Sequence, residues 1–218
     1  MSEVHPAGAA LRDDARDADY LRLAALDPVM ARLVEELGER SLERHPWGSA
    51  RDDGFATLVE TIVGQQVSNL VAKVLFGRLT ELCGGRPSPE TVLALDPAEL
   101  RAAGLSARKT EYVRGLAERV VSGELDLAAL SAAADEEVER QLVAVRGIGP
   151  WSAQLFLMFH LRRPDVFPAA DLGLQIAVHR VYGLEARPSA AELARMSERW
   201  RPFRTLAAIY LWESRRDG

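Results

Sequence analysis

A short glycine-containing turn between two apolar helical segments constrains this chain more than any other feature. The turn is Arg146-Gly147-Ile148-Gly149, and two glycines two positions apart let the backbone take positive φ and come close to a ligand. Apolar residues recur at helical spacing on both sides of it, and Pro150 suits the first position of the second helix. The pattern predicts a helix, a tight hairpin and a second helix over about residues 135–161.

The predicted hairpin has the features of a phosphate-binding turn. Amide groups in the turn and at the start of the second helix have no acceptor within a helix, and the helix dipole adds partial positive charge there. Ile148 supplies an apolar plug between the glycines, and the small residue Ala153 lets the two helices pack closely. Many Gly-x-Gly pairs are ordinary turns, so the phosphate site and the plain turn are both open readings at this point.

A single aspartate, Asp171, stands just before another apolar helical run that begins near Leu174. Aspartate is a favourable residue at a helix N-terminus, and capping alone would account for its presence. The dipole and the free amides also keep such a carboxylate ionised near neutral pH. An ionised carboxylate that faces a groove can stabilise a sugar cation, so a structural and a catalytic role are compatible.

Four segments taken together resemble a known family. They are GFATLVETIVGQQVSN, VRGIGPWSAQLF, PAADLGLQIAV and ERWRPFRTLAAIYLW, and they span most of the chain from Phe55 to Trp212. In this order they are similar to the 3-methyladenine DNA glycosylase II family of the helix-hairpin-helix DNA glycosylase superfamily. The resemblance implies an all-α, two-lobed enzyme with its active site in the cleft between the lobes. It also implies that Asp171 is the catalytic residue.

The resemblance implies an activity as well as a fold. The expected enzyme flips an alkylated purine of the 3-methyladenine type out of double-stranded DNA and hydrolyses the N-glycosidic bond, which leaves an abasic site for base excision repair. Bifunctional relatives carry a lysine after the Gly-x-Gly segment, and this chain has Pro150-Trp151 there. No amine that could form a Schiff base is available at that position, so we expect a monofunctional hydrolase without lyase activity.

Family positions also suggest which residues contact DNA and the base. The resemblance makes Gln66 the wedge that fills the gap left by the flipped nucleotide, although glutamines within an apolar run can also satisfy neighbouring backbone groups. The other expected DNA contacts are Gln65, Ser68, Arg146, Gly147, Ile148, Gly149 and Ser152.

Two tryptophans and a leucine are the expected base pocket. The resemblance places Trp151 and Trp212 at its walls, where the rings can stack on a cationic alkylated purine, although core packing is the commoner fate of tryptophan. Leu155 stands where the family often has tyrosine, which implies a more open pocket. We expect no cofactor and no metal held by side chains. A monovalent cation at the hairpin carbonyls near Gly147 and Gly149 is a further expectation.

Composition fits a globular protein and limits the alternatives. The chain has 218 residues, of which 48% are hydrophobic and 27% charged. Its one cysteine, Cys83, provides neither a disulfide framework nor the four-cysteine iron–sulfur cluster of the endonuclease III branch. The net charge of −5 argues against a nucleic-acid partner, but basic residues such as Lys73, Lys109 and Arg146 accompany the motifs. We therefore expect a locally positive face on an acidic protein.

The pattern of helical runs and breaks predicts three parts. Residues 1–18 form a tail, residues 19–69 with 166–218 form one helical lobe, and residues 70–165 form a central lobe that contains the hairpin. Residues 53–82 read as one helical run. Too few residues precede the first motif for the N-terminal mixed α/β domain that the family often has, so we expect a compact form. We also expect a monomer in the bacterial cytoplasm, associated with the nucleoid and with no membrane segment.

Two alternatives remain open at the level of the sequence. One is a helix-hairpin-helix module that binds DNA without catalysis, against which Asp171 is the main argument. The other is a glycosylase for other lesions or for mismatches, since the sequence does not rank substrates.

Overall fold

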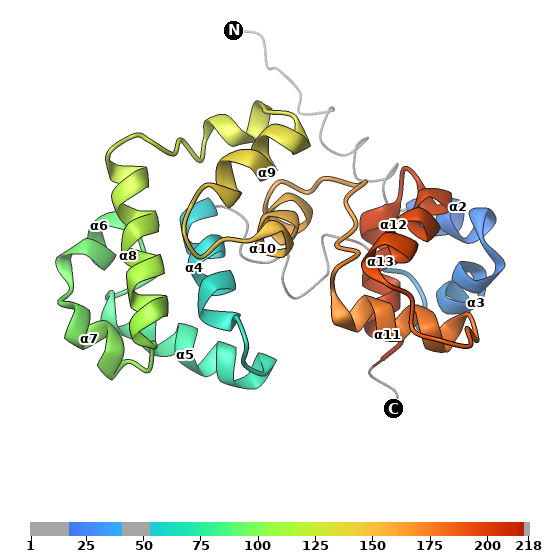
Figure 1. Ribbon diagram of the computed structural model, residues 1–218, viewed down its shortest axis with the longest axis horizontal. Coiled ribbons are helices and arrows are strands. Elements are labelled where there is room, and N and C mark those ends of the chain that lie inside the picture. The colour runs from blue at the N-terminus through green and yellow to red at the C-terminus, as the bar shows by residue number, and fades with distance from the viewer. Residues whose placement is uncertain (1–17, 41–52, 216–218) are drawn as a thin grey trace, which may run out of the picture. The chain divides into compact units, whose positions relative to one another are not determined.

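The computed structural model describes residues 18–40 and 53–215, and every regular element within those ranges is a helix (Figure 1). The expected all-α fold is therefore confirmed. Residues 1–17 of the expected tail lie outside the described residues. None of the helices described is both long and apolar enough to cross a bilayer. The chain divides into two compact units, residues 1–49 with 162–218 and residues 50–161, which we call the terminal unit and the central unit.

The terminal unit is built around its last helix. Its helices are α2 (Asp19–Leu26), α3 (Pro28–Leu37), α11 (Leu172–Val181), α12 (Ala190–Ser197), the short 3-10 helix η4 (Glu198–Trp200) and α13 (Arg204–Glu213). Every residue of α13 from Thr205 to Leu211 is buried, and the helix contacts α2, α3, α11 and η4. A helix that is apolar on all sides belongs in a core, and α13 is that core helix.

One buried carboxylate organises the start of this unit. Asp27 is 3% exposed and separates α2 from α3, a region that reads as a single helical run in the sequence. Its Oδ1 accepts a hydrogen bond from the Val29 amide at 2.8 Å, which caps α3. Its Oδ2 accepts from the Tyr182 hydroxyl at 2.8 Å and from Trp200 Nε1 at 3.3 Å. Asp27 is thus a structural carboxylate with its oxygens occupied by protein donors.

The central unit surrounds a different apolar helix. Its helices are α4 (Gly54–Gly64), α5 (Asn69–Leu82), α6 (Pro89–Ala94), α7 (Pro97–Ala102), α8 (Ala107–Val121), η2 (Ala129–Ala132), α9 (Asp135–Val143), α10 (Pro150–Leu155) and the π-helix η3 (Phe156–His160). Six of the eleven residues of α4 are buried, and this helix packs against α5, α8, α10 and η3.

Two expectations about the glutamine segment are corrected. Residues 53–69 lie in the central unit rather than with the terminal segments, because α4 packs against the central helices. Residues 162–165, expected in the central lobe, lie in the terminal unit. The run 53–82 is two helices, α4 and α5, because Gln66 takes a φ of +59° and the Ser68 side chain caps the new helix. A left-handed residue cannot continue a right-handed helix. The break leaves Gln65 and Gln66 in a turn.

Candidate functional site

The hairpin between α9 and α10 requires glycine at its first glycine position. Gly147 has a φ of +97°, and a Cβ built there would lie 2.3 Å from Cγ of Tyr112 on α8. Both the backbone conformation and the packed ring exclude a side chain. Ile148 is 4% exposed, which agrees with its expected role as an apolar plug. The same burial leaves its side chain little surface for the DNA contact that was also expected of it.

Gly149 differs from Gly147 in what surrounds it. Its φ is −98°, which other residues adopt readily, and a Cβ there would meet no atom within 4 Å. The first helical hydrogen bond of α10 runs from the Ala153 amide to the Gly149 carbonyl at 3.0 Å. The amides before Ala153 therefore point out of the helix end, beside open space at Gly149. This arrangement suits the close approach of an anion such as phosphate.

Gln65 and Ser152 were expected at the DNA surface, and the structure directs both side chains to the hairpin instead. Gln65 Nε2 donates to the Gly147 carbonyl at 2.8 Å and to Ser152 Oγ at 3.4 Å. Ser152 is 3% exposed. The physical reason is that the Gly147 carbonyl needs a donor and the Gln65 amide at the end of α4 reaches it. Gln65 thus braces the hairpin.

The same carbonyl bears on the expected monovalent cation. A cation at Gly147 would share that oxygen with the Gln65 amide, so the cation remains a prediction. Within residues 18–40 and 53–215, no three or more His, Cys, Asp or Glu side chains gather as metal ligands would.

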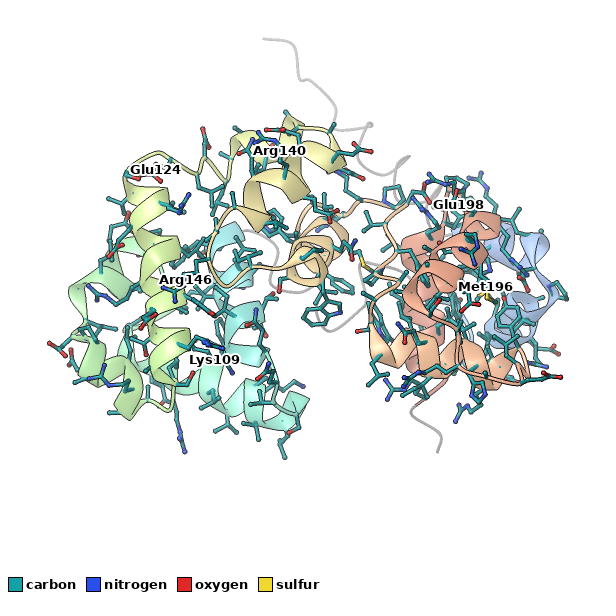
Figure 2. All side chains as sticks on the ribbon, viewed as in Figure 1. Lys109, Glu124, Arg140, Arg146, Met196 and Glu198 are labelled. Carbon is teal, nitrogen blue, oxygen red and sulfur yellow. The ribbon has the colours of Figure 1, made fainter. Side chains whose placement is uncertain are left out.

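Two positively charged side chains, those of Arg146 and Lys109, lie beside the turns of the central unit (Figure 2). Arg146 has 79% of its side chain exposed, lies 3.5 Å from Glu111 Oε2 and stands 5.8 Å from the ring centroid of Tyr112. Lys109 Nζ donates to the Val63 carbonyl at 2.7 Å, near the C-terminal end of α4. Burial lowers the pKa of this ammonium group from its ordinary value. Arg146 therefore presents its charge at the surface, whereas Lys109 holds the end of α4.

The turn after α4 presents the expected wedge at the surface. Gln66 is exposed and has a left-handed backbone, an uncommon conformation for a residue other than glycine. Ser68 is also exposed, and its Oγ accepts from the Val71 amide at 3.4 Å. Backbone strain of this kind is frequent at functional sites.

Sequence reasoning missed an apolar stripe that follows this turn. Leu70, Val71 and Val74 at the start of α5 are 74%, 44% and 47% exposed. The spacing of these residues places them on one face of the helix. Reading residues 53–82 as one helical run gave no indication that apolar side chains at the start of α5 are exposed.

Asp171 is half-buried at the N-terminus of α11 and has two hydrogen-bond donors on one oxygen. The Leu174 amide donates to Oδ1 at 2.8 Å, which makes Asp171 the N-cap of the helix. The indole Nε1 of Trp212, on α13, donates to the same Oδ1 at 3.0 Å. The carboxylate is therefore both a helix cap and a partner of the predicted pocket residue Trp212.

The space next to this carboxylate depends on a glycine. A Cβ built on Gly173 would lie 2.8 Å from Asp171 Oδ1 and 2.4 Å from Nη1 of Arg215. A guanidinium and the carboxylate thus approach the same point. Neither Gly173 nor Arg215 was singled out in the sequence, because no local pattern indicates a contact between Gly173 and a residue in the turn after α13.

The remaining predicted pocket residues lie in the central unit. Trp151 is half-buried on α10, and Leu155 is 5% exposed at the end of the same helix. Leu155 is therefore a buried residue. The grouping of Trp151, Leu155 and Trp212 as one base pocket remains a prediction.

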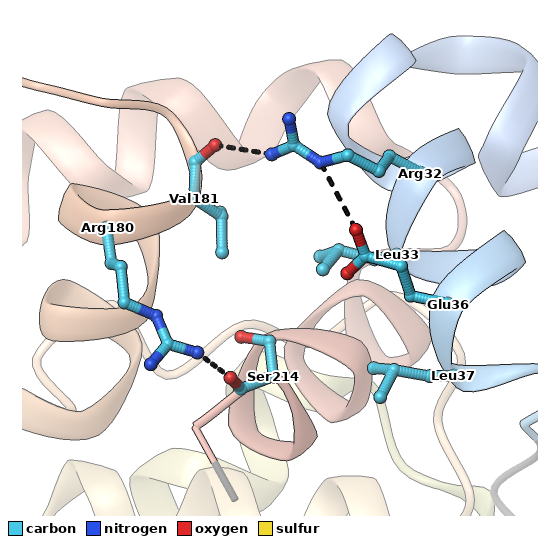
Figure 3. A pocket seen from close by; sticks show the side chains of 7 residues that line it. All are labelled: Arg32, Leu33, Glu36, Leu37, Arg180, Val181 and Ser214. Atoms are coloured by element: carbon cyan, nitrogen blue, oxygen red, sulfur yellow. Dashed lines mark hydrogen bonds and ion pairs between the residues drawn. The ribbon is translucent and has the colours of Figure 1, made fainter. Parts of the chain in front are cut away.

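A cavity of about 360 Å³ in the terminal unit is lined by arginines that have structural roles (Figure 3). Arg32 Nη2 donates to the Val181 carbonyl at 2.8 Å, and Arg180 donates to the Ser214 carbonyl. These carbonyls lie at the C-terminal ends of α11 and α13, where cations are favourable. Neither Asp171 nor Trp212 lines this cavity.

Comparison with known proteins places this arrangement in a family. Residues 59–202 match the model for the HhH-GPD superfamily base excision DNA repair protein. DNA-3-methyladenine glycosylase 1 of Schizosaccharomyces pombe is 31% identical over 201 residues, which cover 89% of this chain and 85% of that protein. The Bacillus subtilis protein YfjP is 37% identical over 167 residues, which cover 73% of this chain but 58% of the relative.

A solved structure shares the fold. The Schizosaccharomyces pombe 3-methyladenine DNA glycosylase Mag1, in complex with abasic DNA, superimposes with a TM-score of 0.82 at 31% identity. The match covers 89% of this chain and 95% of that one. The expected helix-hairpin-helix glycosylase fold is thereby confirmed.

Proposed function

This chain belongs to the HhH-GPD superfamily of base excision DNA repair proteins, and from that premise we propose that it is a DNA glycosylase that releases alkylated purines. The observation that carries the proposal is the Asp171 carboxylate, half-buried at a helix N-terminus and held by the Trp212 indole at 3.0 Å. The matched sequence and the matched structure from Schizosaccharomyces pombe are both named as 3-methyladenine DNA glycosylases.

The proposed reaction needs one fixed negative charge. Alkylation at N3 or N7 makes the purine a cationic leaving group, so the C1′–N bond breaks with both electrons departing on the base. The deoxyribose gains oxocarbenium character, which the Asp171 carboxylate stabilises electrostatically. A water oxygen then forms the new bond to C1′ and releases its proton. No protein group forms a covalent bond in this reaction, and Trp151 stands where a lyase would need lysine.

The DNA contacts that we propose lie on the central unit. The hairpin amides around Gly149 and the exposed Arg146 hold a phosphate, which fixes the position of the strand without reading a base. Gln66 fills the gap in the base stack, and its exposed left-handed turn supports that role. The exposed stripe of Leu70, Val71 and Val74 then meets the apolar sugar faces of the duplex.

Release of free bases from methylated DNA tests the proposal. We expect the protein to liberate methylated purines, identified by chromatography, and Asp171→Asn to slow this release by about 100-fold or more. Asparagine caps a helix as well as aspartate does, so the variant keeps its fold. Asp96→Asn is the matched control, because Asp96 also caps a helix, through the Ala98 amide at 2.6 Å, but stands at the start of α7 in the central unit.

Two results would contradict the proposal. A wild-type protein that binds abasic DNA but releases no base is the non-catalytic binding module. Unchanged release by Asp171→Asn assigns the chemistry to another residue. Strand breaks that appear without alkali would instead contradict the monofunctional mechanism.

A further inference from the structure

Two donors from different helices converge on a single oxygen of the candidate catalytic carboxylate. The Leu174 amide of α11 reaches Asp171 Oδ1 at 2.8 Å, and Trp212 Nε1 of α13 reaches it at 3.0 Å. An oxygen that accepts from two separate elements has its position restrained by both of them.

Trp212 is a firm support for this contact. It directly follows Ile209, Tyr210 and Leu211, which are all 0% exposed in the core helix α13. Trp212 itself is half-buried, and its indole N–H is presented from a helix whose preceding residues are fixed in the core.

Gly173 is a second, independent indication that the local structure fixes the position of the Asp171 carboxylate. A methyl group at residue 173 would lie 2.8 Å from Asp171 Oδ1, closer than real Cβ contacts allow, and 2.4 Å from Arg215 Nη1. The backbone here is compatible with other residues, so the glycine serves the approach of the side chains rather than a turn. Any larger residue would displace the carboxylate or the guanidinium.

We propose that Trp212 is a positioning residue for Asp171, whose indole N–H fixes the carboxylate toward the sugar cation. Its effect on the reaction passes through that hydrogen bond, beyond any stacking of its ring on the base. This inference rests on the proposed function and deepens it. Trp212, expected only as a wall of the base pocket, is here the residue that orients the Asp171 carboxylate.

The test compares two duplexes that carry stable analogues of the abasic sugar. One contains a pyrrolidine, which is cationic and mimics the oxocarbenium ion, and the other contains a neutral tetrahydrofuran. The ratio of the two dissociation constants measures how well the carboxylate meets the cation. We expect Trp212→Phe, which keeps an aromatic ring but removes the N–H, to lower this preference about 10-fold, with tetrahydrofuran binding unchanged.

A double variant separates positioning from stacking. In an Asp171→Asn background, Trp212→Phe should have no further effect on the preference, because the two residues act through one bond. Trp212→His, which restores an aromatic N–H, should recover part of it. Gly173→Ala should lower it without touching the tryptophan, which keeps the inference testable if Trp212→Phe folds poorly.

The control is another tryptophan of the same unit. Trp200 Nε1 also donates to a carboxylate, Oδ2 of Asp27, at 3.3 Å, so Trp200→Phe should lower the melting temperature but leave the preference intact. An unchanged preference in Trp212→Phe, or an equal loss with and without Asp171, would overturn the inference. If the proposed function itself is wrong, the wild-type protein will release no purine and show no preference for the cationic analogue, which is a distinct result.

Discussion

The side-chain amide of Gln65 donates to the main-chain carbonyl of Gly147 at 2.8 Å, across 82 positions of sequence. This bond ties the turn after α4 to the hairpin between α9 and α10. Gln66, the proposed wedge, is the next residue in that turn, so the two parts of the proposed DNA surface share one hydrogen bond. The wedge and the phosphate site are therefore expected to be held in register by a residue that itself faces inward.

Replacement of Gln65 by alanine should weaken both the hairpin and DNA binding. The Gly147 carbonyl loses its side-chain donor, and a loss of about 1 kcal/mol in the free energy of unfolding is expected. Urea denaturation and fluorescence anisotropy with duplex DNA measure the two effects. Gln141→Ala is the control, because the Gln141 amide donates to Glu137 on its own helix, α9, at 2.6 Å. Equal DNA affinity in the two variants would contradict the bracing role.

Alanine should have different effects at the two hairpin glycines: it should lower stability at Gly147 and lower DNA affinity at Gly149. Gly147→Ala forces a side chain onto a φ of +97° and against the Tyr112 ring, so we expect a loss of stability of about 2 kcal/mol or more. Gly149→Ala meets open space and should leave stability within about 0.5 kcal/mol. Its methyl group should nevertheless weaken duplex binding, because it occupies the space where we place the phosphate. Gly149→Ala with wild-type affinity would move the phosphate site elsewhere.

Gln66→Gly should separate stability from activity. The residue has a φ of +59°, and glycine adopts that conformation without the steric cost that glutamine pays, so stability should stay equal or rise by up to about 1 kcal/mol. Base release from duplex DNA should slow by about 10-fold, because nothing then fills the gap left by the flipped nucleotide. Single-turnover release and thermal unfolding measure the two quantities. Release at the wild-type rate would show that Gln66 is not the wedge.

Local signals in the sequence predicted the helices and the hairpin well, because each depends on neighbours. Asp171 as a helix cap and Ile148 as a buried plug follow from residues within one or two turns. The break between α4 and α5 was missed, because apolar residues continue through it and the left-handed position holds Gln66 rather than glycine. The residue types at the break gave no warning.

Contacts between distant residues account for the rest. The bond from Trp212 to Asp171 spans 41 positions, and no pattern along the chain indicates that an indole would face this carboxylate. The same holds for Tyr112 against Gly147 and for Arg215 beside Gly173. The family resemblance named several of the participants. It did not say which of them contact one another.

The apolar stripe at the start of α5 leads to a prediction that salt can test. Leu70 is 74% exposed, and exposed apolar groups of this kind mark contact surfaces when they cluster. Leu70→Ser should lower affinity for duplex DNA several-fold while the dependence on salt keeps its slope, because an apolar contact releases no counterion. Arg146→Gln should instead reduce that slope by about 1, since it removes one phosphate contact.

The matched control for Leu70 is Val121→Ser, at the end of α8, where the side chain is 56% exposed in the same unit. Both substitutions remove an exposed apolar group, so both should leave the melting temperature unchanged. Only the first lies next to the Gln66 turn, and only the first should weaken DNA binding. The affinities of both variants are measured by anisotropy at several salt concentrations. Equal affinities would show that the stripe is not part of the DNA-binding surface, because loss of an exposed apolar group at Leu70 would then matter no more than the same loss at Val121.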